Sequence, residues 1–146
     1  MIQALALLAP VAIGVFGGWG AFRGGERCYA IARPVVAGGR VGGYATVADW
    51  PRRGRWATFH VHLSTARNRA RPVTLSVGER RFRLVASARD AWAADTASER
   101  AIVAAMRGAR SMSVEAVSAA GQPFADSYAL DGAATAIDAA RIRCRS

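Results

Sequence analysis

Two histidines, His60 and His62, stand one residue apart in the segment HVHLSTARNRAR, which covers residues 60–71. In an extended strand this spacing places both imidazoles on one face, as in some metal sites. A metal site needs at least a third ligand, yet the chain has no other His, and no nearby Cys or carboxylate stands out. The pattern therefore predicts ordinary sheet residues, with no metal and no cofactor.

Motifs for catalysis are missing from the rest of the sequence. There is no G-x-S-x-G, and only the two histidines could serve as a general base. Asp90, Asp95 and Glu99 are close in sequence, but they straddle a predicted helix start, where acidic residues suit the helix dipole. AGGRVGG, residues 37–43, lacks the Lys-Ser/Thr ending of a phosphate loop and reads as a connector. We therefore expect a protein that is not an enzyme.

Arginine clusters are the remaining candidates for binding. All 20 basic residues are Arg, and with 10 acidic residues they give a net charge of +10. Arg grips phosphate and carboxylate, and such a charge attracts nucleic acid, anionic glycolipid or acidic polymers. The candidate anion-binding residues form three groups: Arg52, Arg53 and Arg55; Arg67, Arg69 and Arg71; and Arg81 and Arg83.

A merely solvated basic surface is the alternative to an anion site. Nucleic-acid modules interleave basic residues with exposed aromatics or present a basic recognition helix. Here the outward aromatic is expected to be chiefly Trp56, and neither predicted helix is strongly basic.

Strands should position most of these residues. From Trp56 to Leu63 apolar and polar residues alternate, with Ala57 and Phe59 on one face and Trp56, His60 and His62 on the other. Residues 73–77 and 81–85 alternate in the same way around a Gly78-Glu79 turn, which predicts a meander of three consecutive antiparallel strands. Earlier, residues 19–22 and 28–34 flank Gly24-Gly25 as a hairpin, and a further strand is expected near residues 44–47.

Two helices interrupt the strands. Thr96 with Glu99 predicts a capping box at the start of the first helix, which Gly108 ends, and Asp131 is expected to cap a terminal helix around Ile137. Residues 111–118 and 124–130 return to extended patterns. The fold class is therefore mainly β (α+β), an antiparallel β-sandwich-like sheet with one mid-chain and one C-terminal helix. The expected core is Phe59, Val61, Leu63, Val73, Leu75, Val77, Phe82, Leu84, Ile102, Met106 and Ile137.

The first residues form an apolar segment, MIQALALLAPVA, with no charge before Arg23. Its length suits a signal peptide, although no basic residue precedes it and Pro10-Val11-Ala12 is a poor cleavage site. A membrane anchor and an apolar first element of the domain are the alternatives; glycines at 17, 18 and 20 interrupt the run before it could span a bilayer. We expect export, with residues 1–12 as the signal or apolar segment and residues 13–146 as a single β-rich domain without a transmembrane span.

The two cysteines, Cys28 and Cys144, lie near opposite ends of the chain. They form neither a C-x-x-C motif nor a zinc ribbon. An even pair in a small exported domain predicts one disulfide, and two buried free thiols in a cytosolic protein are the alternative.

Several segments together resemble the invasion-associated locus B family of alphaproteobacteria. They are WGAF followed by RCYAIARP, the strand WATFHVHLS, the hairpin VTLSVGERRFRLV and the late YALDGAATAIDAARIRC, so the resemblance spans most of residues 19–144. Family members end in a motif like S-L-x-G-F-x-x-A before a terminal helix, and residues 127–133 look like a variant with Ala133 at the aromatic position. Members often carry further cysteines, which this chain lacks, so the Cys28–Cys144 pairing rests on the cysteine count alone.

The resemblance implies a small, exported, largely β protein of the periplasm or envelope, loosely tied to host-cell invasion or stress, and it supplies no catalytic residues. Taken with the residues, it predicts a non-enzymatic protein that binds an anionic envelope component or a protein partner through a basic surface. A cytosolic basic nucleic-acid-binding module is the alternative. The ligand and the oligomeric state are left open by the sequence.

Overall fold

The computed structural model of the chain describes residues 9–39 and 42–145. Within them ten strands form one antiparallel sheet in the order β1-β2-β3-β4-β5-β8-β7-β6-β9-β10. The strands are β1 (Val11–Phe16), β2 (Trp19–Gly24), β3 (Arg27–Ala32), β4 (Tyr44–Trp50), β5 (Arg55–His62), β6 (Val73–Val77), β7 (Arg80–Ala86), β8 (Asp90–Ala93), β9 (Ser111–Val117) and β10 (Pro123–Ala129). The helices are α1 (Thr96–Gly108) and α2 (Ala133–Arg145), with one 3₁₀ turn at Pro51–Arg53. The predicted fold class is confirmed.

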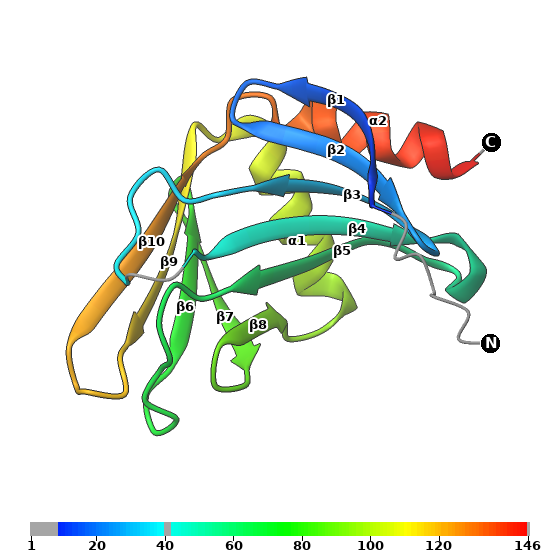
Figure 1. Cartoon of the computed structure of the whole chain (residues 1–146). Helices are drawn as coiled ribbons and strands as arrows, with labels where there is room; N and C mark the ends of the chain where they lie inside the picture. The colour runs from blue at the N-terminus through cyan, green and yellow to red at the C-terminus, as the bar shows by residue number, and fades with distance from the viewer. Residues whose placement is uncertain (1–8, 40–41, 146) are drawn as a thin grey trace, which may run out of the picture.

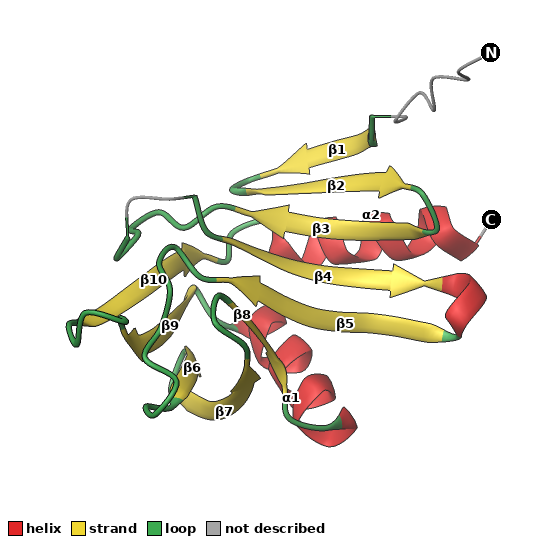
Figure 2. Cartoon of the chain, turned by 60° about the horizontal axis from the view of Figure 1, so that its bottom comes forward, coloured by secondary structure: helices red, strands yellow, loops and turns green. Residues whose placement is uncertain are grey.

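The sheet bends so that its two halves run in different directions (Figure 1). Strands β1 to β5 form one half, and β6 to β10 turn away from them toward the side that carries the helices (Figures 1 and 2). The far strand β10 returns to the segment after β3, where Val36 bridges Ser127. This return gives the single sheet its sandwich-like form.

Both helices cover the same face of the sheet, α2 against β1 to β4 and α1 against β5 to β8 (Figure 2). The core lies between sheet and helices, because alternate residues of each strand point toward the helices. Every residue predicted for the core is buried, and Trp19 and Tyr128, which the sequence did not single out, are almost fully buried as well. Burial of such large side chains stabilises the fold by about 1.5–3 kcal/mol each.

The predicted meander of three consecutive strands is wrong in one respect. The short strand β8 lies between β5 and β7, pairing His60 with Trp92 on one side and Val85 with Trp92 on the other. β6 therefore lies at the far side of β7, next to β9. β8 has only four residues and begins with Asp90, so it is too short for an alternation of apolar and polar residues to predict it.

The start of α1 differs by one residue from the prediction. Asp95, not Thr96, is the N-cap: its carboxylate accepts the Ser98 backbone N–H at 2.7 Å, and the Ser98 hydroxyl returns to the Asp95 backbone. Glu99 does not cap the helix, because its carboxylate accepts the backbone N–H of Phe59. Asp90 belongs to β8 and not to the helix start. The terminal helix does lie where it was predicted.

The predicted disulfide is confirmed, since Cys28 of β3 is bonded to Cys144 of α2 with 5.9 Å between their Cα atoms. At the N-terminus, Val11 and Ala12 pair with Arg23 and Phe22 as part of β1. Most of the predicted signal segment, residues 1–8, lies outside the described residues. Neither helix in the described part of the chain has the length and apolarity that membrane crossing requires.

Candidate functional site

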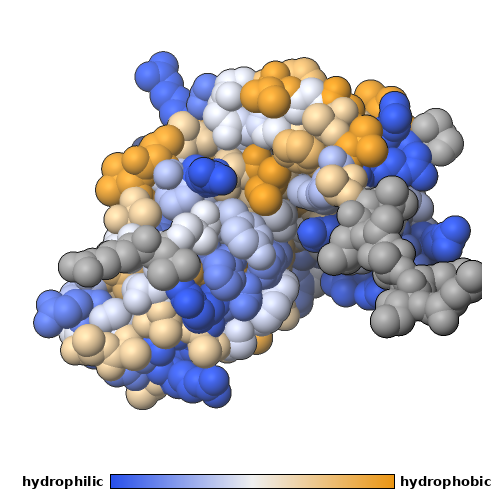
Figure 3. Space-filling view, viewed as in Figure 1, coloured by the Kyte–Doolittle hydropathy of each residue, from blue (hydrophilic) through white to orange (hydrophobic). Residues whose placement is uncertain are grey.

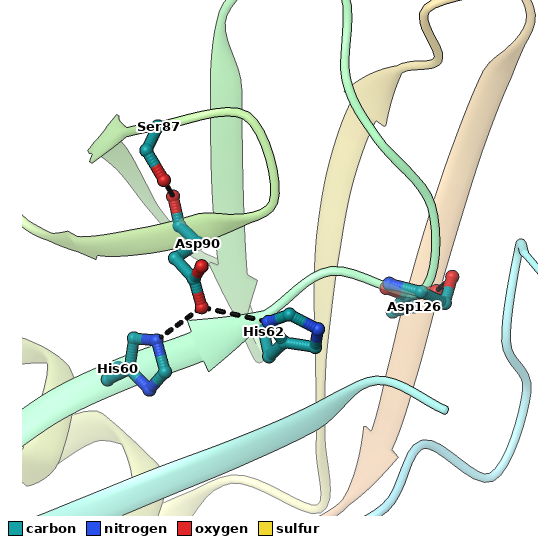
Figure 4. Close-up of polar contacts among 6 residues, drawn as sticks. His60, His62, Ser87, Asp90 and Asp126 are labelled. Atoms are coloured by element: carbon teal, nitrogen blue, oxygen red, sulfur yellow. Dashed lines mark hydrogen bonds and ion pairs between the residues drawn. The ribbon is translucent and has the colours of Figure 1, made fainter. Parts of the chain in front are cut away.

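The outer face of the sheet, opposite the helices, carries a cluster of His60, His62 and Asp90 (Figure 4). His60 and His62 both leave β5 on this face, and pairing with β8 brings Asp90 beside them. One carboxylate oxygen, Oδ1 of Asp90, lies 2.8 Å from Nε2 of His60 and 2.9 Å from Nδ1 of His62. The expectation that the histidines lack a nearby carboxylate is thus wrong, because the carboxylate comes from a strand thirty residues later.

The charge of Asp90 fixes how the two imidazoles are oriented. Desolvation alone would raise the pKa of Asp90, but the hydrogen bonds from His62 and His60 outweigh it and hold the pKa below its ordinary value of 3.8. An ionised carboxylate only accepts, so both imidazole nitrogens that face it carry protons. Among the described residues, no group of three or more His, Cys, Asp or Glu is arranged to hold a metal ion.

Aromatic rings surround this cluster. The Tyr44 ring stacks on His62 with 5.1 Å between centroids, and the Trp92 ring stacks on His60 at 5.5 Å. Trp92 is 43% exposed, so its indole offers an open ring on the outer face. Each histidine ring therefore stacks on an aromatic neighbour, and the shared Asp90 carboxylate fixes the orientation of both rings.

A second group on the same face combines arginines with aromatic rings. The Arg27 guanidinium lies 4.4 Å from the centroid of the Tyr29 ring and 5.4 Å from that of Trp50. Arg53, in the turn after β4, lies 4.9 Å from the Trp50 centroid, and Phe22 stacks on Tyr29 at 5.8 Å. Stacking of this kind restrains the long Arg side chains while their N–H groups stay available to a ligand.

An outer cleft of ≈450 Å³ joins the two groups. It is lined by Arg27, Thr46, Ala48, Trp50, Arg53, Arg55, Thr58, Phe59, His60, Trp92, Ala93 and Glu99. The cleft opens where β8 pairs only with residues 60–62, so that Glu99 of α1 accepts the Phe59 backbone N–H at 3.0 Å in place of a strand. Figure 3 views this outer face, with hydrophobic side chains gathered toward β1 and β2 and more hydrophilic ones over β4 and β5.

The structure brings only part of the first predicted arginine group into this cleft. Arg53 and Arg55 line it, while Arg52 is exposed outside it. The side-chain nitrogens of Arg52 and Arg53 each lie 4.0 Å from a carboxylate oxygen of Glu26.

The second and third groups lie on other elements. Arg67 donates to the backbone carbonyls of Ser87, Ala86 and Arg71, so this guanidinium holds the connection between β5 and β6 together. Arg69 and Arg71 are exposed in that same connection, and Arg81 and Arg83 are exposed on β7. Arg81 also lies 3.5 Å from Glu115. These residues do not converge on the outer cleft, and their part in anion binding stays a prediction.

Trp56 lies on the opposite face from the one predicted. Asp49 of β4 stands opposite two residues of β5, Trp56 and Ala57, which makes a β-bulge. Ala57 adopts a φ of 52°, and its N–H donates to the Asp49 carboxylate at 2.7 Å. The bulge turns the indole toward the helices, where the Arg141 guanidinium lies 5.3 Å from its ring.

The sequence did not predict most residues of the outer site: Phe22, Arg27, Tyr29, Tyr44, Trp50, Asp90 and Trp92. A partial signal existed for Arg27 and Tyr29, which alternate in sequence with Cys28 and Ala30; the structure buries Cys28 and Ala30, but it buries Tyr29 as well. No local signal marks Asp90, whose neighbours on β5 are set by tertiary pairing.

Comparisons with known proteins bear on the family. The chain matches no curated protein and no solved structure. Residues 21–141, most of the chain, match the family described as Invasion associated locus B (IalB) protein. The chain therefore belongs to the invasion-associated locus B family.

Proposed function

We propose that this chain is an exported, non-enzymatic protein of the bacterial envelope that binds an anionic glycolipid in the outer cleft. The observation that carries the proposal is the position of Arg27 and Arg53, whose guanidinium groups both lie over the ring of Trp50 in the lining of that cleft. Planar guanidinium groups bind phosphate and carboxylate through paired hydrogen bonds.

The other lining residues suit the remainder of such a ligand. His60 and the hydroxyl oxygen of Thr58, whose proton is donated to the Ala48 carbonyl, offer hydrogen bonds, and Trp50 and Trp92 offer flat apolar surfaces. A sugar ring has both an apolar face and a rim of hydroxyl groups, so an acidic glycan matches this mixture better than a bare anion does. Glu99 is the one carboxylate in the lining, and its charge is directed to the Phe59 N–H.

Export is supported by family membership and by the disulfide. Disulfides between distant residues persist in oxidising compartments such as the periplasm and are rare in the cytosol. The net charge of +10 would draw the protein to anionic surfaces there.

The test is a titration of the oxidised protein with lipopolysaccharide micelles, compared with micelles of a zwitterionic lipid. Arg27→Gln should weaken binding to lipopolysaccharide about 10-fold or more, the effect of one hydrogen-bonded charge. Arg69→Gln is the matched control, because it removes the same charge from an exposed loop position outside the cleft.

Equal losses for Arg27→Gln and Arg69→Gln would contradict a site in the outer cleft and leave only the general attraction of charge. The interleaving of arginines with aromatic rings also resembles the surfaces that bind single-stranded nucleic acid. Tighter binding to a single-stranded oligonucleotide than to lipopolysaccharide would therefore overturn the proposal in favour of the nucleic-acid alternative.

A further inference from the structure

A second cleft lies on the helix side of the sheet, between α1, α2 and the bulged part of β5. Its volume is ≈640 Å³. It is lined by Gly54, Arg55, Trp56, Ala57, Thr58, Thr96, Glu99, Arg100, Val103, Ala104, Arg107, Ile137 and Arg141. We call it the inter-helix cleft. It shares Arg55, Thr58 and Glu99 with the outer cleft. Its aromatic ring, Trp56, and its least exposed arginine, Arg141, lie on the helix side of the sheet and do not line the outer cleft.

Trp56 and Arg141 lie against each other in the lining of this cleft. The β-bulge at Ala57 turns the Trp56 indole to the helix side, and the Arg141 guanidinium of α2 lies over its ring. The Arg141 side chain is half-buried, and its Nε is fully buried with no hydrogen-bond partner in the described part of the chain. Nε itself faces protein atoms, but Arg141 lines the cleft, so the other N–H groups of its guanidinium can meet an acceptor supplied by a ligand.

The charges around Arg141 leave the cleft positive. Asp49 lies buried nearby, and its carboxylate already accepts the Ala57 N–H. Asp138 is held by Arg107, with nitrogen–oxygen distances of 2.7 and 3.3 Å, and Glu99 accepts the Phe59 N–H. Arg141 attracts Asp49 and Asp138 electrostatically, but each of these carboxylates accepts its hydrogen bond from another donor, while Arg55 and Arg100 add exposed positive charge at the rim.

We propose that the inter-helix cleft is a second binding site, for a small organic acid that carries one carboxylate or phosphate on a flat apolar body. The anionic group accepts hydrogen bonds from Arg141, and Arg100 at the rim adds attraction. The apolar body lies against Trp56, Val103 and Ile137, the apolar side chains of the lining. This site does not depend on the glycolipid proposal, because its ligand contacts neither Arg27 nor Trp50.

The probes are 2-naphthoate and 2-naphthyl phosphate, with 2-naphthylmethanol as the neutral analogue. Binding is followed by the shift of the Trp56 indole N–H resonance in ¹⁵N-labelled protein, assigned with Trp56→Phe. We expect saturable binding of at least one anion, no more than weak binding of the alcohol, and a loss of about 10-fold or more in Arg141→Gln. Naphthoate alone would identify a carboxylate site, and naphthyl phosphate alone a phosphate site.

Arg145→Gln is the matched control, because Arg145 lies on the same helix and, like Arg141, acts on the charge of Asp49. It should leave the affinity for the anions unchanged, as should Arg27→Gln in the outer cleft. If Arg141→Gln does not fold, Arg141→Lys keeps the charge without the planar fork and should still weaken binding. Equal affinity of Arg141→Lys or Arg141→Gln and the natural protein, equal binding of the alcohol, or the absence of saturable binding would each overturn the proposal.

Discussion

At Asp90 a single carboxylate oxygen serves two imidazoles, and this sharing holds the outer end of β5 to β8. The arrangement gives the carboxylate a pKa below 3.8 in the folded protein. A group whose pKa is lowered on folding contributes stability above its unfolded pKa and loses that contribution as the pH falls through the folded value. Asp90 therefore links the stability of this region to acid conditions.

The prediction at this residue is a pH-dependent effect of Asp90→Asn. Near pH 6 the variant should lose about 1 kcal/mol of unfolding free energy, because the charge-assisted hydrogen bonds from His60 and His62 are weakened. The difference from the natural protein should shrink as the pH falls below 3.8 and through the lowered pKa of the folded protein, where the Asp90 carboxylate becomes protonated. Urea unfolding at several pH values measures it.

Ser87→Ala serves as the control for this experiment. The Ser87 hydroxyl donates to the Asp90 backbone oxygen at 3.4 Å and does not touch the carboxylate. Its effect should not change with pH, and a pH-independent loss in Asp90→Asn would show that the charge of Asp90 has no part in stability.

Asp126 has a comparable structural role on β10. Its carboxylate accepts the backbone N–H groups of Gly38 and Ser64, each at 2.9 Å, and the Ser64 hydroxyl at 2.5 Å. Asp126 is almost fully buried, so these donors replace the water it loses. One carboxylate thereby ties β10 to the connectors that follow β3 and β5.

Among the elements, the contact between the β1–β2 turn and the start of α2 explains the late family-like motif. The Trp19 indole donates to the Ala129 carbonyl at 2.9 Å, and the Gly18 N–H donates to the Asp131 carbonyl at 3.2 Å. Gly132 adopts a φ of +82°, and its Cα packs against the Phe16 carbonyl. Residues 127–133 thus lock the end of β10 onto the first hairpin just before α2 begins.

Gly132→Ala should break this lock. A Cβ there would overlap the Phe16 carbonyl oxygen, a backbone atom, and would also strain the positive φ. We expect a loss of at least about 3 kcal/mol of unfolding free energy, or failure to fold. Denaturant unfolding followed by circular dichroism measures the loss.

Gly121→Ala separates strain from overlap. Gly121 has nearly the same φ, +86°, but a Cβ there meets no atom within 4 Å. This variant should lose only the roughly 1–2 kcal/mol that a left-handed conformation costs an L-residue. Similar losses of unfolding free energy at Gly132 and Gly121 would contradict this prediction, because the overlap with Phe16 would then contribute nothing.

For the whole molecule, the disulfide closes the chain from β3 to its last helix. Cys28 and Cys144 are 116 residues apart, so the bond encloses almost the entire domain. It fixes α2 on the sheet face formed by β1 to β4, which α2 covers. Closure of so long a loop chiefly restricts the unfolded chain.

Reduction, or the double variant Cys28→Ser and Cys144→Ser, should lower the free energy of unfolding by about 4–5 kcal/mol on the chain-entropy model. Urea unfolding with and without reductant measures this loss. The reductant should have no effect on the double variant, which is the internal control. Unchanged stability after reduction of the natural protein would show that the fold does not depend on covalent closure.

The sequence by itself determined the local features of this protein. Alternation in residues 56–63, 73–77 and 81–85 predicted β5, β6 and β7 with their buried residues, because the faces of a strand follow directly from a period of two. Capping signals predicted both helices, although the N-cap of α1 lies one residue earlier than predicted, and the cysteine count predicted the disulfide. Short segments predicted the family, which the match over residues 21–141 confirms.

Only the tertiary structure decided which distant residues meet. Strand order depends on contacts between segments far apart in the chain, so β8, and with it Asp90, could not be placed beside His60 from local pattern. The bulge at Ala57 places the Trp56 side chain on the face opposite to the predicted one, because one extra residue in a strand shifts the alternation of side chains between the two faces. Both clefts arise at the same place, where β8 ends short of residues 55–59 and the helix α1 takes over from the sheet.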